Sequence, residues 1–321
     1  MTTTTTKPKR SRSRRKYDGP SAEEKLCQEI IQLIESGVNP WRREWRKGAA
    51  GGHRNLITGK NYQGSNPALL ECYQQARGYE LPLWCGSSQA RAKGWHPIKG
   101  SKCAYVVRPQ ANRFEDEVKN IQTGEMETVE RAWMSYKPAA VFNVAELKGK
   151  DEKSQAALDR AILEAQGLVT DQPEIQRLEH AEKVFSEWQV KTKFQGDKAF
   201  YVPAADSITM PERHLWDSQS GLYATWAHEC IHSTGHEKRL KREMSGRFGS
   251  KKYAREELVA ELGAFLVCNR LNIGSDANNH ASYLAHYAEV LREGPKVLFK
   301  VLSDATKASN LILGAEVTDN D

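Results

Sequence analysis

The feature that most constrains this chain is a pair of histidines four residues apart, with an acidic residue beside the first, in His228-Glu229-x-x-His232. Residues at i and i+4 share one face of an α-helix, so both imidazoles can reach one metal ion. Glu229 is then close enough to serve as the general base of a zinc hydrolase. Apolar neighbours predict that this helix is buried, and Gly235 stands where it should end.

A metal site of this type needs a third protein ligand. A second helix-like segment, 256–266, offers Glu257 as that ligand and Glu261, one turn later, as a carboxylate that orients a histidine. Glu256 is the alternative ligand. The same residues also fit a solvated, charged helix face that binds no metal, so the third ligand is what separates the two interpretations.

Length and composition limit the class of protein. A chain of 321 residues can form two domains with cores of their own. It contains no apolar run of membrane-spanning length and no apolar signal core, so we expect a soluble, cytoplasmic protein without a membrane partner. Its six cysteines are scattered, which favours reduced thiols over a disulfide framework.

Charge divides the chain into two unlike halves. Residues 1–150 hold 26 basic and 15 acidic side chains, a net charge of +11. Residues 151–321 hold 21 basic and 26 acidic side chains, a net charge of −5. Five of the eight tryptophans lie in the basic half. These differences predict a polyanion-binding half followed by an acidic half that carries the metal.

The order of the segments predicts an α+β protein with two domains. One is a small α+β domain, and the other is mostly helical with a short sheet. The expected boundaries are a disordered basic tail at 1–20, a first domain at 21–147, a linker with a helical part at 148–172 and a second domain at 173–315.

Hydrophobic patterning predicts the elements inside these domains. A capping-box pattern at Ser21 begins a helix that ends near Gly37. Further helices are expected at 67–78, 87–94 and 173–190, and strands at 102–108, 133–143, 199–203 and 207–211. The polar stretch 109–130 is expected to form a hairpin excursion between two of these strands.

Tryptophans and cations alternate in Trp41-Arg42-Arg43-Glu44-Trp45. Proteins that bind single strands use this mixture, because aromatic faces stack on bases while Arg and Lys follow the phosphates. A tryptophan in a small domain is nevertheless often a core residue.

Several motifs together resemble a known family. In the first half these are Pro40-Trp41, Trp45, Asn55, Thr58-Gly59, Tyr62, Gly64, Asn66, Ser88-Gln89-Ala90, Lys99-Gly100 and Val141-Phe142-Asn143. They resemble the amino-terminal domain of the ArdC antirestriction proteins and of plasmid primase-like proteins. The second half, from Tyr201 through the histidine motif to Glu261, is similar to that family's zincin-like, SprT-like metallopeptidase domain. The likeness covers roughly residues 20–315.

The resemblance implies a single-stranded-DNA-binding domain followed by a metallopeptidase domain, in a protein of a plasmid, phage or other mobile element that protects incoming DNA from host restriction. It implies His228 and His232 as metal ligands, Glu229 as the catalytic carboxylate and Glu257 as the third ligand. SprT-like enzymes usually use a third histidine, which makes His236 a further alternative. The metal implied is Zn²⁺, with Mn²⁺ as another candidate.

The expected nucleic-acid contacts are Trp41, Arg42, Trp45, Arg54, Asn55, Tyr62, Asn66 and Gln89. The expected partners are single-stranded DNA and an unidentified protein substrate. Candidates for holding an oxyanion are Tyr253, His236 and His286. Two other functions fit the same residues. One is a non-enzymatic DNA binder whose metal is structural, and the other is a protease with only incidental affinity for nucleic acid.

Overall fold

The computed structural model describes residues 20–37, 52–119, 126–167, 174–247, 249–273 and 281–314. Its first helix, α1 (Ala22–Glu35), begins with the predicted capping box at Ser21. The Ser21 hydroxyl accepts a hydrogen bond from the Glu24 amide, and the Glu24 carboxylate accepts one from the Ser21 amide. Although α1 opens the chain, it packs against the last two helices, α8 (Ala281–Leu291) and α9 (Pro295–Ile312).

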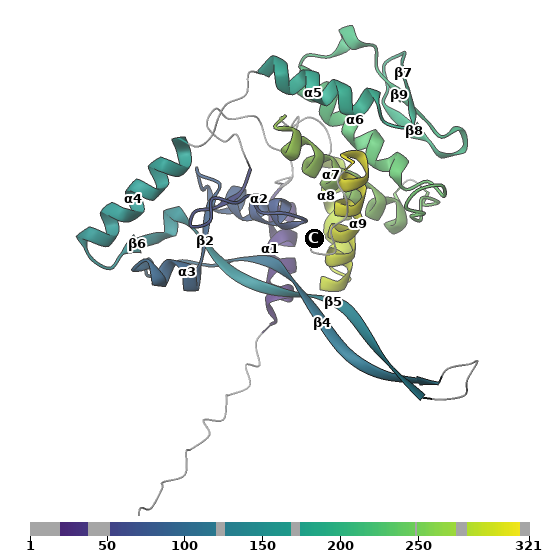
Figure 1. Cartoon of the computed structure of the whole chain (residues 1–321). Helices are drawn as coiled ribbons and strands as arrows, with labels where there is room; N and C mark the ends of the chain where they lie inside the picture. The colour runs from purple at the N-terminus through teal and green to yellow at the C-terminus, as the bar shows by residue number, and fades with distance from the viewer. Residues whose placement is uncertain are drawn as a thin grey trace, which may run out of the picture.

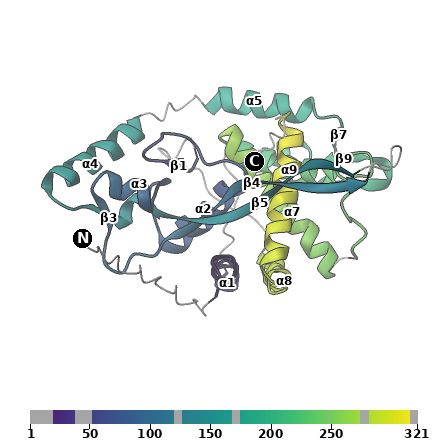
Figure 2. The same cartoon turned by 60° about the horizontal axis from the view of Figure 1, so that its bottom comes forward.

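The amino-terminal domain is built on a four-stranded sheet of order β1-β2-β5-β4. Its strands are β1 (Arg54–Asn55), β2 (Leu83–Gly86), β4 (Ala104–Lys119) and β5 (Met126–Asn143), with the helices α2 (Asn66–Arg77) and α3 (Ser87–Ala92) between them. β1 is parallel to β2, and the other pairs are antiparallel. The predicted hairpin excursion is confirmed. β4 and β5 stay paired from Ala104↔Val141 to Lys119↔Met126 and project from the domain as an arm (Figures 1 and 2).

The segment expected to be a linker contains a helix that packs on this domain. α4 (Glu152–Gly167) follows the small β3 (Trp95–Pro97)–β6 (Leu147–Gly149) sheet and contacts β6. Leu158 of α4 is 1% exposed and shares a hydrophobic cluster with Trp95, whose indole N–H donates to the Ser154 carbonyl. α4 therefore contributes core residues in addition to connecting the domains.

The carboxy-terminal domain is mainly helical, as predicted. After α5 (Glu174–Ser186) come the strands β7 (Lys191–Phe194), β8 (Phe200–Val202) and β9 (Ser207–Met210), then α6 (Gln219–Thr234), α7 (Lys251–Leu271), α8 and α9. The sheet has the order β7-β9-β8. β8 and β9 were predicted, whereas β7 was not. Its four residues alternate between charged and apolar or hydroxyl side chains, and its parallel partner β9 comes later in the sequence.

One large hydrophobic cluster joins the two domains. It includes Leu26 and Ile30 of α1, Trp84 of β2, and Leu258 of α7, all at most 2% exposed. Burial on this scale is the main stabilising contribution to folding, at about 25 cal/mol per Å² of apolar surface. Because the cluster spans α1, α2 and α7, the domains are packed together through a shared core. Among the described residues, no helix has both the length and the apolarity needed to cross a bilayer.

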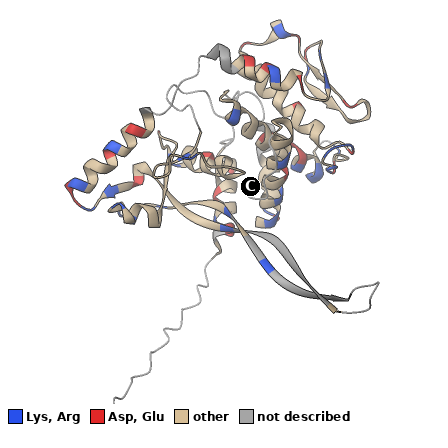
Figure 3. Cartoon of the chain, in the orientation of Figure 1, with Lys and Arg blue, Asp and Glu red and all other residues tan. Residues whose placement is uncertain are grey.

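The burial of two tryptophans corrects part of the prediction that the tryptophans of the basic half help to bind a polyanion. Trp84 is fully buried and Trp95 is 3% exposed, so both are core residues and neither offers a face to a base. Trp41 and Trp45 lie outside the described residues, as do Arg42 and the basic tail 1–19. Residues 1–19 and 38–51 carry eleven Lys or Arg and two acids, a net +9. The described surface accordingly mixes both signs, for example along α4 (Figure 3).

Candidate metal centre

Helix α6 carries the histidine motif through the core. The Ser218 hydroxyl caps its first turn by accepting a hydrogen bond from the Gly221 amide, and the helix ends at Thr234 with Gly235 as its C-cap, as predicted. Leu222, Trp226 and Ala227 are at most 2% exposed. The apolar flank therefore fixes α6 in the domain and leaves one face for His228 and His232.

Two histidines on α6 and one glutamate on α7 bring three donor atoms together. The Nε2 atoms of His228 and His232 are 3.1 Å apart. Glu257 Oε2 is 3.6 Å from His228 Nε2, and Glu257 Oε1 is 3.5 Å from His232 Nε2. Bonds of 2.0–2.2 Å to a tetrahedral ion imply donors about 3.3 Å apart. The two Nε2 atoms are close to that separation, each lies within 3.6 Å of a Glu257 carboxylate oxygen, and one ligand atom from each residue lies within 4.8 Å of the others, so these residues fit a single divalent ion.

Glu257 supplies a fixed negative charge to this site. Burial alone would raise the pKa of its carboxyl group, but a hydrogen bond from His228 and the nearby ring of His232 outweigh it and lower the pKa to about 2. Tyr253, one turn earlier on α7, also donates to this carboxyl group. Glu257 is therefore ionised at neutral pH, which is the form that binds a cation.

The carboxylates around His228 make its imidazole strongly basic. Burial lowers its pKa, but the carboxylates of Glu257, Glu261 and Glu229 more than offset this and raise the pKa to about 9. A ligating imidazole must be neutral at its donor nitrogen, so metal binding displaces a proton here. The charge of Glu261 acts on His228, and its role in orienting a histidine stays a prediction.

Glu256 lies behind the site instead of in it. Its Oε1 atom is 3.3 Å from His232 Nδ1, the nitrogen that faces away from His228. Arg242 donates to both Glu256 oxygens, at 2.7 and 3.0 Å. Burial raises the pKa of the Glu256 carboxyl group, but Arg242 and His232 outweigh it and hold the pKa below its ordinary value. An ionised Glu256 accepts a hydrogen bond from the Nδ1–H group of His232. The proton of the neutral ring is then on Nδ1, and the lone pair of Nε2 is available to bind a metal ion.

The other residues expected near the site fall in different places. Glu229 is 7% exposed and follows His228 on α6. Tyr253 is beside Glu257, which keeps it a candidate for contacting a reacting oxygen. His236 lies beyond the C-cap, and its Nδ1 accepts a hydrogen bond from the Lys238 amide, so it is absent from the cluster of donor atoms. His286 is on α8.

A glycine sets the distance between the two ligand-bearing helices. Gly263 of α7 faces Ile231 of α6, and a Cβ atom at 263 would lie 2.7 Å from Ile231 Cδ1. Carbon atoms in contact are normally about 3.5–4.0 Å apart. The absence of a side chain at 263 therefore allows α7 to approach close enough for Glu257 to meet both histidines. Sequence reasoning missed this role and that of Arg242, because both depend on which residues face each other.

Three of the expected nucleic-acid contacts lie together in the structure. Asn55 of β1 donates through Nδ2 to Gln89 Oε1 at 3.0 Å and to the Tyr62 hydroxyl at 3.3 Å. Its Oδ1 accepts the amides of Ile57 and Thr58. Asn55 therefore holds the 56–61 turn against α3. A contact of Asn55, Tyr62 and Gln89 with nucleic acid stays a prediction.

The remaining two described residues of that set make other contacts. Arg54 donates to the Asn61 side chain at 3.2 Å at the turn. The Nδ2 group of Asn66 donates to the Val107 carbonyl at 2.9 Å, and its Oδ1 atom accepts from the Val107 amide at 2.7 Å. These two hydrogen bonds connect α2 to β4. Both side-chain ends of Asn66 are thus engaged inside the protein.

Comparison with known proteins matches the two halves separately. Residues 20–142 match the family described as the N-terminal domain of anti-restriction factor ArdC. Residues 179–304 match a family described as a zincin-like metallopeptidase. The chain is an ArdC-type protein. The resemblance expected from the motifs is confirmed, together with the two-domain α+β fold.

Relatives of this ArdC-type chain include much longer proteins. Two DNA primases named TraC from Escherichia coli are 32% and 30% identical over 311 residues, which is 91% of this chain. The match spans only 20% and 27% of those proteins. Protein y4eC of Sinorhizobium fredii is 29% identical over 291 residues, covering 89% of this chain and 90% of that protein.

Solved structures give the same result for the fold. The metal-free crystal structure of the antirestriction ArdC protein from plasmid R388 aligns over 91% of this chain and 97% of that one. Its TM-score is 0.62 at 28% identity. The Mn(II)-bound structure of the same protein aligns over 92% and 98%, with a TM-score of 0.63 at 25% identity. Together with the donor cluster on α6 and α7, this supports a divalent metal ion in the ArdC-type site.

Proposed function

We propose that this chain is an antirestriction protein of a mobile element, which binds single-stranded DNA and hydrolyses peptide bonds at a divalent metal centre. The observation that carries the proposal is the convergence of His228, His232 and Glu257, which offer one ligand atom each within 4.8 Å of one another, in a domain of the zincin-like type. Three protein donors leave one coordination position for a substrate or solvent oxygen, which is the arrangement of catalytic zinc sites.

The chain's own groups have distinct roles in this reaction. A divalent ion, when bound, supplies Lewis-acid polarisation of a peptide carbonyl. Glu229, next to a ligand on the same helix, takes a proton from the attacking water and passes it to the leaving amine. Tyr253 donates a hydrogen bond at the edge of the site and is the residue best placed to reach an oxyanion. Glu256 and Arg242 keep His232 oriented.

Zn²⁺ is the metal we propose, with Mn²⁺ as the alternative. Two imidazoles and one carboxylate are a ligand set that zinc hydrolases use. The ArdC structure from R388 has been solved with Mn(II), which supports Mn²⁺ as the alternative. Elemental analysis of protein purified without added metal decides between them.

DNA binding is assigned to the amino-terminal domain. The match to the ArdC amino-terminal domain and the net charge of +11 over residues 1–150 support this assignment. Affinity should fall steeply with salt, because bound Lys and Arg release counterions from the strand. A flat salt profile would count against a polyanion site.

The burial of the candidate metal ligands favours a second function, in which the ion is structural. The side chains of His228, His232 and Glu257 are 13%, 14% and 9% exposed. Such burial also suits a structural ion in a protein that protects DNA only by covering it. In that case the metal serves folding and Glu229 has no chemical role.

One experiment separates the two functions. Purified wild type and Glu229→Gln are compared for metal content and for cleavage of an unstructured protein, with and without single-stranded DNA. The peptidase proposal expects equal metal content, cleavage by wild type and loss of cleavage in the variant. Restriction protection in cells is then measured for both proteins. Full protection by Glu229→Gln, with no cleavage by wild type, would establish the occlusion function instead.

A further inference from the structure

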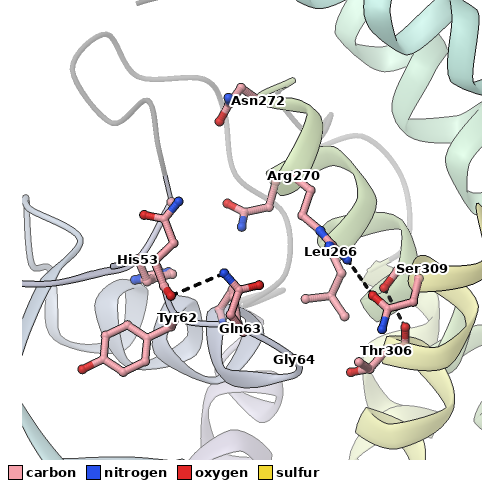
Figure 4. A pocket seen from close by; sticks show the side chains of 14 residues that line it. His53, Tyr62, Gln63, Gly64, Leu266, Arg270, Asn272, Thr306 and Ser309 are labelled. Atoms are coloured by element: carbon pink, nitrogen blue, oxygen red, sulfur yellow. Dashed lines mark hydrogen bonds between the residues drawn. The ribbon is translucent and has the colours of Figure 1, made fainter. Parts of the chain in front are cut away.

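A polar cleft lies where the two domains meet, away from the candidate metal ligands. It has a volume of about 280 Å³ and is formed by the 52–64 loop on one side and the last turns of α7 and α9 on the other. Figure 4 shows these two walls, with Gln63 and Gly64 facing Leu266 and Arg270 across the gap. The described lining contains no acidic side chain. The cleft is therefore suited to a neutral or electron-rich polar ligand.

Two side chains in the cleft have hydrogen-bonding groups to offer. The Nη1 atom of Arg270 is held by Asn310 Oδ1 at 2.6 Å. No carboxylate among the described residues pairs with Arg270, and its Nε and Nη2 groups have no partner there. The side-chain amide of Asn269, next to Arg270, has no partner among the described residues. It lies close to Gly52 on the opposite wall, where an added Cβ atom would be only 3.2 Å from it. The guanidinium is thus oriented by one bond and open on its other edge.

The ends of two helices make this a poor phosphate site. Arg270 and Asn269 are in the last turn of α7, and Ser309 and Asn310 are in the last turn of α9. Helix carboxyl ends carry partial negative charge, which repels phosphate and stabilises a guanidinium. An uncharged ring with acceptor atoms on its edge fits better than an anion.

We propose that this cleft binds one unstacked purine base of a single strand, with guanine preferred. An arginine presents paired N–H donors that match O6 and N7 of guanine. The Asn269 side-chain oxygen can accept from the ring's own N–H donors. This inference rests on the proposed binding of single-stranded DNA and adds a base preference and a second contact surface to it.

The location has a consequence for the metal centre. Glu257 and Arg270 are thirteen residues apart on α7, which places them about 20 Å from each other along the helix axis. A strand seated in the cleft is thus bound at one end of the helix whose other end carries a metal ligand. The base itself stays out of reach of the metal, so its binding does not require the ion.

The test is fluorescence anisotropy with three labelled oligodeoxythymidylates, one unmodified, one with a single central dG and one with a single central dA. Wild type is expected to bind the dG strand about tenfold more tightly than the unmodified strand. Arg270→Gln should remove that preference, so that this variant binds the dG strand and the unmodified strand with equal affinity. Asn269→Ala should reduce it. Lys296→Gln, an exposed cation at the other end of α9, is the matched control and should keep it.

The salt dependence distinguishes a base from a phosphate. If Arg270 contacts a base, Arg270→Gln keeps the wild-type slope of affinity against salt. A slope reduced by about 0.7 would reveal a lost phosphate contact and overturn the base assignment. Equal wild-type affinity for all three strands would also overturn it, while leaving DNA binding intact. No binding of any strand would remove the proposed function itself.

Discussion

Replacing Gly263 by alanine tests whether the spacing of α6 and α7 sets the metal site. The added Cβ atom would lie 2.7 Å from Ile231 Cδ1, 2.9 Å from Cγ2 and 3.0 Å from Cγ1. Ordinary contact requires about 3.5 Å or more, so the side chain or the helix must move by roughly 0.5–0.8 Å. Because all three atoms belong to a branched side chain in a packed core, a change of rotamer does not clear them all.

The expected cost follows from these contacts. Overpacking of a core costs about 1–3 kcal/mol, whereas alanine in place of a helical glycine gains up to about 1 kcal/mol. We expect a net loss of about 1–2 kcal/mol in the free energy of unfolding. A shift of this size exceeds the ±0.2 Å tolerance of metal–ligand distances, so metal affinity should fall about tenfold or more.

The assay has two parts, urea unfolding and competition for metal with a chromophoric chelator. The double variant Gly263→Ala/Ile231→Ala supplies the control, because it removes the atoms that clash. It should recover metal affinity even though Ile231→Ala alone opens a cavity and destabilises the core. Gly263→Ala with wild-type stability and wild-type metal affinity would refute the reasoning.

Three other predictions concern single contacts. Glu256→Gln should lower metal affinity about tenfold without abolishing it, because His232 loses the carboxylate that accepts its Nδ1 proton, and chelator competition measures this. A hydrogen bond from Arg239 lowers the pKa of the Asp206 carboxyl group to about 2. The ionised Asp206 therefore adds about 1–2 kcal/mol to the free energy of unfolding. This stabilisation is complete above the unfolded pKa near 4 and is lost as pH falls through 2. Asp206→Asn should flatten that part of the stability–pH curve, and an unchanged curve would contradict the assignment. Trp84→Phe should cost about 1–3 kcal/mol in urea unfolding, since it leaves the buried His53 Nδ1 without the indole donor; a loss below 0.5 kcal/mol would contradict this.

Much of the metal site was predictable because it depends on local order in the chain. The spacing of His228 and His232 fixes their common face on any α-helix, whatever surrounds it. The start of α1 at Ser21 follows from capping chemistry that involves only neighbouring residues. The long hairpin of β4 and β5 was likewise expected from the patterning of adjacent segments.

Other features required the packed structure. β7 pairs with β9, which comes later in the sequence, and β7's own pattern is too short and too polar to indicate a strand. Trp84 could have been a stacking surface or a core residue, and only its complete burial beside His53 decided for the core. The cleft at Arg270 joins residues more than 200 positions apart, so no local pattern could indicate it.

The choice between Glu256 and Glu257 shows what the sequence alone could and could not determine about the third ligand. Adjacent residues on a helix point about 100° apart, so the sequence determined that one of the two would face the histidines but not which one. The rotation of α7 against α6 decided it. In the packed structure Glu257 faces the two Nε2 atoms and Glu256 faces Arg242.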